Sequence, residues 1–281
     1  MFEKILYPTD FSDVSLHALH NCLPPDLFEL GAKELHLLHV IDITVAELQA
    51  FELEEIYKNK LEELAKTLRE KGGIDVKTSV RIGIPSLEIA EEAESIGADL
   101  IISPSVGENV WRQMFLGSTA SNLVRATRRP VLLLKYSKKD DSFELPPVKC
   151  SELFQRPLVA LDFSECSEKI TNAVAKFREL IEKGILLHSV DYGKIDELES
   201  NIEAAKKRLE EIAEKLGVEF EKEVMVGTAS QAIIGTALAK KATLIVIGKK
   251  GRSIIKELIL GSTAERVIRD SKLPVLLVPC E

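Results

Sequence analysis

A chain of 281 residues is long for one compact core and suits two domains of about 140 residues each. Its 45% apolar and 29% charged residues are typical of a globular protein, and a formal net charge of −8 argues against nucleic acid or anionic membrane as main partner. No apolar run reaches the roughly 20 residues that span a bilayer, and no signal peptide is evident, so we expect a cytoplasmic protein.

The first half, expected as a domain over residues 1–137, alternates short apolar runs with longer helical patterns, including a long second helix around 46–71. Charges and three prolines then interrupt all periodicity from Ser137 to Pro157, and residues 138–156 are expected to be a linker. The second domain is expected over residues 157–281. Its strands are predicted at 157–161, 184–190, 218–226, 243–248 and 275–279, and its helices at 164–182, 194–216, 229–241 and 262–271.

The two halves are internal repeats of each other. KILYPTDFSD from Lys4 matches PLVALDFSEC from Pro157, and LHLLHVID from Leu35 matches GILLHSVD from Gly184. The longest match pairs residues 114–135 with 258–279 at a constant offset of 144. Repeated strand–helix alternation predicts an α/β fold with a parallel sheet buried on both faces in each half.

Four cysteines, Cys22, Cys150, Cys166 and Cys280, are scattered along the chain. There is no CxxC pair and no histidine at the spacing of metal ligands. We therefore expect reduced, structural thiols, with neither a disulfide framework nor a zinc site.

A glycine pattern in the second half predicts a phosphate site. The strand TLIVIG ends in Gly248, Gly251 follows after two residues, and Gly261-Ser262-Thr263 follows after nine more. Glycines let the backbone approach phosphate oxygens or adopt positive φ, and the start of the next helix favours an anion. Lys249, Lys250 and Arg252 would add positive charge. Alternatively, the glycines only shape a turn, and Ser262 is the N-cap of the helix, in a capping box with Glu265.

Asp162 is the second candidate, because it ends the first strand of the second half. A carboxylate at the tip of a central strand needs hydrogen-bond donors, which a ribose, an adenine amino group or backbone amides supply. The alternative role is to cap the following helix together with Ser164, the predicted N-cap.

These residues resemble those of the universal stress protein family. The resemblance spans nearly all of both halves and implies two Rossmann-like domains, each with a five-stranded parallel sheet, arranged as a pseudo-dimer through their last strands. It also implies ATP, or AMP or ADP, with or without Mg²⁺, bound across the strand ends of the second half. The implied adenine side comprises Ala160, Leu161 and Asp162, with Ser189 on the second strand, and the ribose-triphosphate side Gly248, Lys250, Gly251, Gly261, Ser262 and Thr263.

The first half departs from the pattern. Pro104 replaces the first glycine, and proline fixes φ and offers no N–H. Glu108, where the second half has Arg252, would repel phosphates. We expect weak nucleotide binding here or none, although adenosine or AMP could fit. The residues that match nucleotide-binding relatives are Pro8, Thr9, Asp10, Val40, Gly107, Gly117, Ser118 and Thr119.

The leading interpretation is a regulatory or stress-response protein in which ATP is a ligand, because no general base or nucleophile accompanies the motif. The alternatives are a slow ATPase or nucleotidyl transferase on a related fold, and a scaffold without nucleotide. His39 and His188 occupy matching strand ends, which the repeat alone explains.

Overall fold

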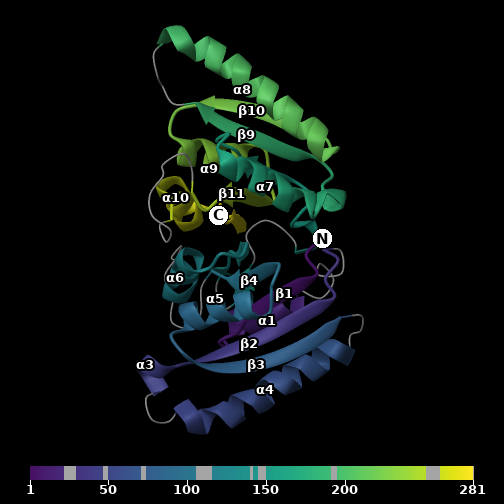
Figure 1. The fold of residues 1–281 in the computed structure, drawn as a ribbon, viewed down its shortest axis with the longest axis vertical. Helices are drawn as coiled ribbons and strands as arrows, with labels where there is room; N and C mark the ends of the chain where they lie inside the picture. The colour runs from purple at the N-terminus through teal and green to yellow at the C-terminus, as the bar shows by residue number, and fades with distance from the viewer. Residues whose placement is uncertain are drawn as a thin grey trace. The chain divides into compact units, whose positions relative to one another are not determined.

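The computed structural model describes residues 1–21, 30–46, 50–70, 74–105, 116–139, 142–144, 150–190, 195–250 and 260–280. The chain divides into two compact units, Met1–Leu145 and Pro146–Glu281, drawn in purple to teal and in teal to yellow in Figure 1. Among the described helices, none has the length and apolar character of a membrane span.

Unit 1 contains a sheet in the order β5-β4-β1-β2-β3, and every neighbouring pair is parallel. Its strands are β1 (Lys4–Pro8), β2 (Glu34–Asp42), β3 (Asp75–Gly83), β4 (Leu100–Pro104) and β5 (Val131–Leu134). Its helices are α1 (Asp13–Asn21), α3 (Ile43–Ala46), α4 (Ala50–Glu70), α5 (Pro85–Ser95) and α6 (Ser118–Ala126). The long helix expected around 46–71 is thus α4, with the short α3 before it.

Unit 2 repeats the plan in the order β10-β9-β8-β11-β12, again all parallel. Its strands are β8 (Pro157–Ala160), β9 (Gly184–Val190), β10 (Phe220–Val226), β11 (Leu244–Gly248) and β12 (Val275–Val278). Its helices are α7 (Glu165–Ala175), α8 (Ile195–Leu216), α9 (Ala229–Ala239) and α10 (Ser262–Asp270), with a 3₁₀ turn at η3 (Arg178–Leu180). The expected α/β class, with a five-stranded parallel sheet in each half, is confirmed.

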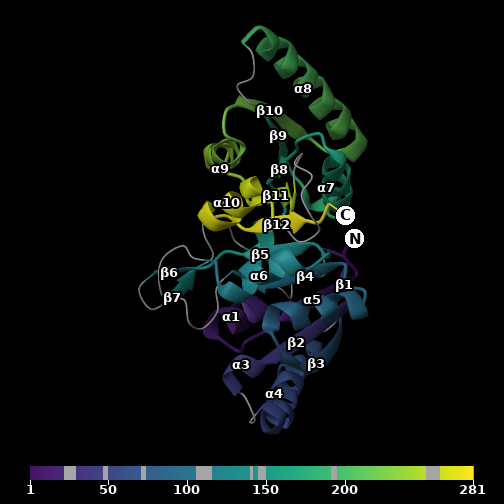
Figure 2. The same cartoon turned by 60° about the vertical axis from the view of Figure 1, so that its left-hand side comes forward.

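The apolar runs of unit 2 explain its layers. Every residue of β8, β11 and β12 is buried, as a parallel sheet covered on both faces requires. Figure 2 shows α9 and α10 on one side of these strands and α7 on the other. Helix α10 buries Ala264, Val267 and Ile268, which the helical repeat places on one face.

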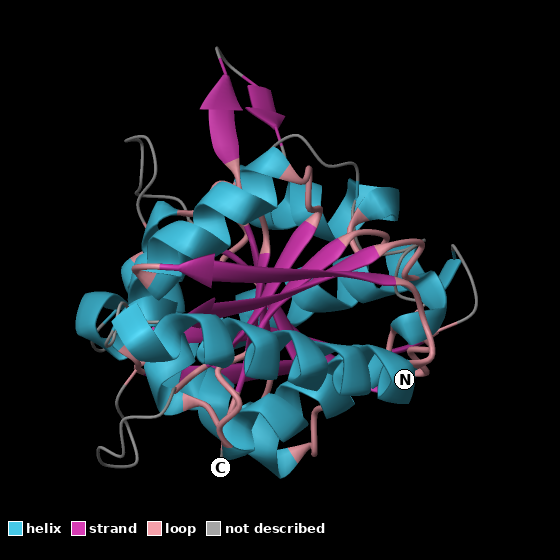
Figure 3. Ribbon diagram, turned by 90° about the horizontal axis from the view of Figure 1, so that it is seen from above, coloured by secondary structure: helices cyan, strands magenta, loops and turns pink. Residues whose placement is uncertain are grey.

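The segment expected to be a linker contains structure that periodicity missed. Strands β6 (Ser137–Lys139) and β7 (Ser142–Glu144) form an antiparallel hairpin, which projects as two short arrows in Figure 3. After the 3₁₀ turn η2 (Cys150–Glu152), Phe154 is buried, and its ring lies 4.9 Å from that of Phe177. The end of this segment therefore packs into the core of unit 2.

Two expected helix starts have different outcomes. Ser164 is the N-cap of α7, as predicted, although its side chain makes no cap hydrogen bond. The prediction that Ser262 caps α10 is wrong, because Gly261 has the extended N-cap conformation and Ser262 is the first helical residue. Glycine is tolerated at this position, since the N-cap needs an extended backbone rather than a side chain.

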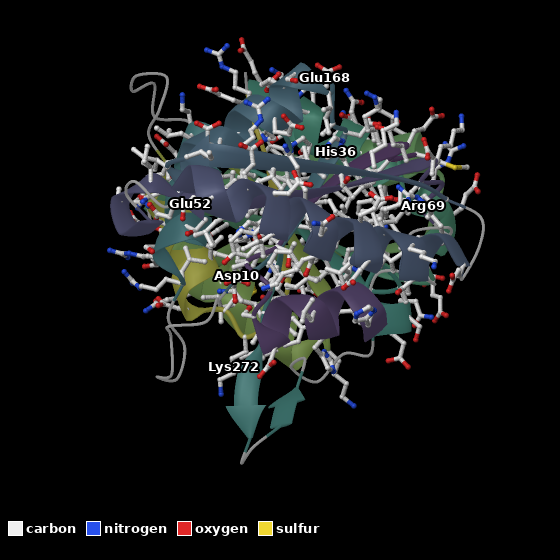
Figure 4. All side chains as sticks on the ribbon, turned by 90° about the horizontal axis from the view of Figure 1, so that it is seen from below. Asp10, His36, Glu52, Arg69, Glu168 and Lys272 are labelled. Atoms are coloured by element: carbon white, nitrogen blue, oxygen red, sulfur yellow. A yellow bond between two sulfur atoms is a disulfide. The ribbon has the colours of Figure 1, made fainter. Side chains whose placement is uncertain are left out.

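A buried polar cluster holds β2, β3 and α5 together around His36, which is labelled in Figure 4. Its Nε2 lies 2.9 Å from Ser79 Oγ and 3.1 Å from Glu92 Oε1, and Arg81 Nε donates to Glu92 Oε2 at 2.6 Å. Nδ1 of His36 is buried without a hydrogen-bond partner among the described residues, so the Nε2–H neutral tautomer fits the site. Burial lowers the pKa of His36.

The lowered pKa of His36 predicts that unit 1 loses stability in acid. The unfolded chain binds a proton at His36 at a higher pH than the folded chain does, so stability is fully present above a pH of about 6.5 and falls below it. His36→Gln keeps an N–H donor without titrating, and should reduce the loss of stability between pH 7.5 and 5.5. Urea unfolding followed by the fluorescence of Trp111, the single tryptophan, measures it.

His17→Gln, at a half-buried position of α1, is the control. An unchanged pH dependence in His36→Gln would show that other groups cause the acid loss.

Candidate functional site

The first strand of unit 2 ends in a turn built by Asp162. Its Oδ1 accepts hydrogen bonds from the Ser164 N–H at 3.0 Å, the Ser164 hydroxyl at 2.6 Å and the Ser167 hydroxyl at 3.2 Å. This carboxylate oxygen therefore organises the start of α7, which is the structural role considered for it. Asp10 does the same in unit 1, with Ser12 N–H at 3.0 Å and the Ser12 hydroxyl at 2.6 Å (Figure 4).

An aromatic residue after each aspartate fixes the turn against the second strand. Phe163 has a φ of 60°, which is uncommon for a side chain of this size. Its ring stacks on His188 with centroids 4.2 Å apart, and Arg208 Cζ lies over the Phe163 ring, 5.2 Å from its centroid. His188 Nδ1 lies 2.7 Å from the Leu161 carbonyl. The Nδ1–H tautomer of His188 thus ties the end of β9 to the turn.

Unit 1 has the same arrangement with different partners. Phe11 also has a φ of 60°, its ring centroid lies 4.9 Å from that of His39, and His39 Nδ1 lies 2.8 Å from the Thr9 carbonyl. Tyr57 of α4 packs on His39 at 4.0 Å. The matching histidines, which the repeat alone could explain, therefore have a positioning role in the turns. Burial lowers the pKa of His39, which favours its neutral form.

The end of β11 is tied to the start of α10 by two backbone hydrogen bonds. Lys249 N–H donates to the Val278 carbonyl at 2.7 Å, and Gly261 N–H donates to the Lys249 carbonyl at 2.9 Å. The first turn of α10 therefore begins at the carboxyl edge of the sheet, where its N–H groups have no partner within the helix. Ser262 is exposed and Thr263 is half-buried, whereas Lys249 is buried and Lys250 half-buried. Gly251, the second glycine of the motif, and Arg252 lie outside the described residues.

The remaining adenine-side candidates lie at the ends of β8 and β9. Ala160 and Leu161 are buried, and Leu161 N–H continues the sheet by donating to the Leu187 carbonyl at 2.9 Å. Ser189 is half-buried, and its hydroxyl donates to the Gly227 carbonyl at 2.9 Å. Because β8, β9 and β11 are parallel neighbours, these residues share one sheet edge with Gly248 and Gly261.

Unit 1 has the same frame of two backbone hydrogen bonds, from strand end to last strand and from helix start to strand end, despite Pro104. Ser105 N–H donates to the Leu134 carbonyl and Gly117 N–H to the Ser105 carbonyl, each at 2.8 Å. Gly117 is the N-cap of α6, followed by exposed Ser118 and Thr119. Pro104 fits as the buried last residue of β4 because its missing N–H is not part of these bonds. Gly107 and Glu108 lie outside the described residues.

Two further first-strand candidates and one on the second strand lie at the same edge of unit 1. Thr9 is buried, and its hydroxyl oxygen accepts from the Phe11 N–H at 3.1 Å and the Ser15 hydroxyl at 2.9 Å. Pro8 ends β1, and Val40, near the end of β2, is half-buried. Among the residues that the structure describes, no cluster of histidine, cysteine, aspartate and glutamate could hold a metal ion.

The expectation that Cys166 and Cys280 are reduced thiols is wrong, because the two residues form a disulfide. Cys166 lies in the first turn of α7, after β8, and Cys280 lies two residues after β12. Strands β8 and β12 flank β11, so these two cysteines, 114 residues apart in sequence, meet over the end of β11. A link closing so long a loop stabilises a fold by roughly 4–5 kcal/mol in the chain-entropy view.

The disulfide also gives Gly248 a structural role, in addition to the phosphate role expected from the sequence. A Cβ on Gly248 would lie 2.5 Å from Cys166 Sγ and 3.0 Å from the Lys250 carbonyl oxygen. The sulfur occupies the space that a side chain at position 248 would need. The φ of Gly248 is not positive, so backbone conformation does not require glycine here. Sequence spacing could not reveal the disulfide, because only the order of β8, β11 and β12 in the sheet brings the two cysteines together.

This contact predicts that Gly248→Ala destabilises the oxidised protein by about 1–3 kcal/mol, because a methyl group must displace the sulfur or the backbone. Gly235→Ala is the matched control. Gly235 is exposed within α9, and its added Cβ would meet nothing within 4 Å, so that change should stabilise by about 0.5–1 kcal/mol. Urea unfolding followed by circular dichroism tests both, and equal effects at the two positions would refute the contact.

Comparison with known proteins identifies the family. The universal stress protein family profile matches residues 1–135 and 154–279. A universal stress protein of Methanocaldococcus jannaschii, MJ0577, is 37% identical over 158 residues, covering 48% of this chain and 96% of that protein. The crystal structure of a universal stress protein from Archaeoglobus fulgidus is 26% identical, covers 99% of this chain and 98% of its own, and superposes with a TM-score of 0.75.

A universal stress protein solved in complex with cAMP is 26% identical and covers 45% of this chain and 98% of its own, with a TM-score of 0.38. With both halves matched by the family profile, and with two repeated five-stranded parallel sheets, the chain belongs to the universal stress protein family as a tandem member with two such domains.

Proposed function

We propose that the second domain, expected over residues 157–281, binds an adenine nucleotide, ATP first among them, at the carboxyl edge of β8, β9 and β11. The observation that carries the proposal is the hydrogen bond from Gly261 N–H to the Lys249 carbonyl. It brings the start of α10 to the end of the strand, where open parallel sheets bind ligands and helix starts bind phosphate.

The phosphate side is assigned to Gly248, Lys250, Gly251, Gly261, Ser262 and Thr263. The N–H groups of the first turn of α10 point out of the helix without internal partners, and the dipole favours an anion there. Exposed Ser262 and half-buried Thr263 present hydroxyls at the same place. Gly248 contributes less directly than the motif suggests, because its missing side chain makes room for Cys166 Sγ.

The adenine and ribose side is assigned to Ala160, Leu161, Asp162 and Ser189. Asp162 is anchored through Oδ1 by three hydrogen bonds from Ser164 and Ser167, so its orientation is set before any ligand arrives. A carboxylate held in this way is a preorganised acceptor for a ribose hydroxyl or an adenine amino group. The stack of Phe163 on His188 keeps the turn in place.

The nucleotide is proposed to act as a ligand that shifts a conformational equilibrium, in a regulatory or stress-response protein. Asp162 is the one acid at the assigned positions, and three donors already occupy one of its oxygens. Mg²⁺ would arrive with the phosphates of ATP. A slow ATPase or a nucleotidyl transferase is the alternative, and either would turn nucleotide over.

The first domain, expected over residues 1–137, is proposed to bind nucleotide weakly or not at all, as a scaffold. It keeps the frame of Ser105, Gly117 and the start of α6 but has a proline at the first glycine position. Pairing of the two domains through their last strands, 131–136 and 275–280, stays a prediction from the sequence, as do the domain boundaries and a cytoplasmic location.

Ser262→Glu is expected to weaken ATP binding by roughly tenfold or more, because a carboxylate would occupy the helix start where phosphate is proposed to bind. Folding should be retained, since acidic residues in the first turn favour a helix. Ser118→Glu makes the same change at the matching position of α6 and should leave ATP affinity unchanged. Isothermal titration with ATP, ADP, AMP and cAMP measures affinity and stoichiometry.

One site per chain is expected. Two sites, with Ser118→Glu abolishing one, would show that the first domain binds nucleotide despite Pro104. Absence of binding to the wild-type chain would leave a scaffold as its function. Rapid steady ATP turnover that Gly251→Val abolishes would replace the ligand role with an enzymatic one.

A further inference from the structure

We infer that the Cys166–Cys280 disulfide is a redox control of the nucleotide site, in which a cellular dithiol reduces the bond and thereby weakens nucleotide binding. The inference rests on the proposed function of the second domain. What carries it is the position of the disulfide, which lies directly against the backbone of Gly248 and Lys250, where the glycine motif begins.

Both sulfurs contact the end of β11. The Lys250 N–H donates to Cys280 Sγ at 3.3 Å, and the place of a Gly248 side chain is filled by Cys166 Sγ, with Cys280 Sγ 3.2 Å from the same point. Lys249 lies between Gly248 and Lys250, and its carbonyl accepts the hydrogen bond from the Gly261 N–H that positions α10. The disulfide therefore supports the residues that set the distance between strand end and helix start.

Reduction cannot leave this packing unchanged. Bonded sulfurs lie about 2 Å apart, whereas two thiols need a van der Waals separation of roughly 3.5–4 Å. Cys166 Sγ is confined by Gly248 and by the buried position of Cys166, which is 4% exposed. The sulfurs can separate only if Gly248, Lys250 or the residues after β12 move. Because Lys249 lies between Gly248 and Lys250, such a movement also displaces the carbonyl that accepts the Gly261 N–H.

The first domain builds its corresponding edge without the link. Val14 follows Asp10 as Cys166 follows Asp162, and Tyr136 follows β5 as Cys280 follows β12. There, Pro104 occupies the position of Gly248, which shows that the strand end itself does not require glycine. The disulfide and its glycine thus occur together in the domain that has the full phosphate motif and are both missing from the other.

Cys280 is the more exposed residue of the pair, so we assign the attack of a reductant to its side. Cys280 is half-buried near the chain end, whereas Cys166 is buried in the first turn of α7, whose positive end stabilises a leaving thiolate. A thiolate of the dithiol attacks Cys280 Sγ, the Cys166–Cys280 bond breaks, and its electron pair leaves on Cys166 Sγ, which takes a proton. The second thiol of the reductant then attacks the mixed disulfide, leaving Cys280 as a thiol and the reductant as a disulfide.

The test measures ATP affinity of the full chain in its oxidised form and after treatment with dithiothreitol. Peptide mapping by mass spectrometry should find the Cys166–Cys280 disulfide in the oxidised protein. Reduction should weaken ATP binding by roughly fivefold or more, the usual range of coupling between sites. Cys166→Ser/Cys280→Ser should bind like the reduced form and ignore dithiothreitol, whereas Cys22→Ser/Cys150→Ser should keep the full response.

A second readout does not need nucleotide. Amide hydrogen exchange of a peptide covering residues 244–250 should increase on reduction, because Lys250 N–H loses its fixed acceptor. Equal ATP affinity in both redox forms would overturn the inference while leaving the proposed function intact. Failure of both forms to bind nucleotide would overturn the proposed function, and unchanged exchange in residues 244–250 would then overturn the structural coupling as well. A redox response that survives in Cys166→Ser/Cys280→Ser would also overturn it.

Discussion

The hydrogen bond from the N-cap amide of a helix to the residue just past a buried strand is the constraint on which both candidate sites depend. In the second domain it joins Gly261 to Lys249, and in the first it joins Gly117 to Ser105. The bond holds the start of α10 or α6 beside the end of the preceding strand, at the sheet edge. Whatever binds at these edges meets helix N–H groups that the fold has already positioned.

The strand-one turn is the second fixed part of each site, and it depends on a residue with unfavourable backbone geometry. Phe163 and Phe11 both have positive φ, which costs of order 1 kcal/mol or more and persists only where neighbours hold it. Asp162 and Asp10 hold the turn from one side through serine hydrogen bonds, and His188 and His39 hold it from the other. The repetition of this arrangement in two domains that differ in their glycine motifs indicates that it belongs to the fold.

The two domains differ instead at the end of the fourth strand of each sheet, which is β11 in the second domain and β4 in the first. Gly248, Lys249 and Lys250 lie beneath a disulfide in one domain, while Pro104 and Ser105 form the matching end in the other. A covalent link between α7 and the second residue after β12 couples three strands of unit 2 at the edge where the ligand is proposed to bind. The Cys166–Cys280 disulfide thus contributes both to the stability of that domain and to the geometry of its proposed site. For this reason, reduction of the sulfurs is expected to change nucleotide binding.

The amino-acid sequence by itself determined the tandem repeat, the α/β class, the strand positions of the second half and the candidate residue Asp162 at the end of its first strand, because these follow from local periodicity and from a pattern repeated along the chain. Strand order, and with it every contact between distant segments, was decided only by the tertiary structure. Cys166 and Cys280 carry no local signal of pairing, since their meeting depends on β8 and β12 both lying beside β11. For the same reason, the close contact of Gly248 with the sulfur of Cys166, 82 residues earlier in the chain, could not be predicted from the glycine pattern.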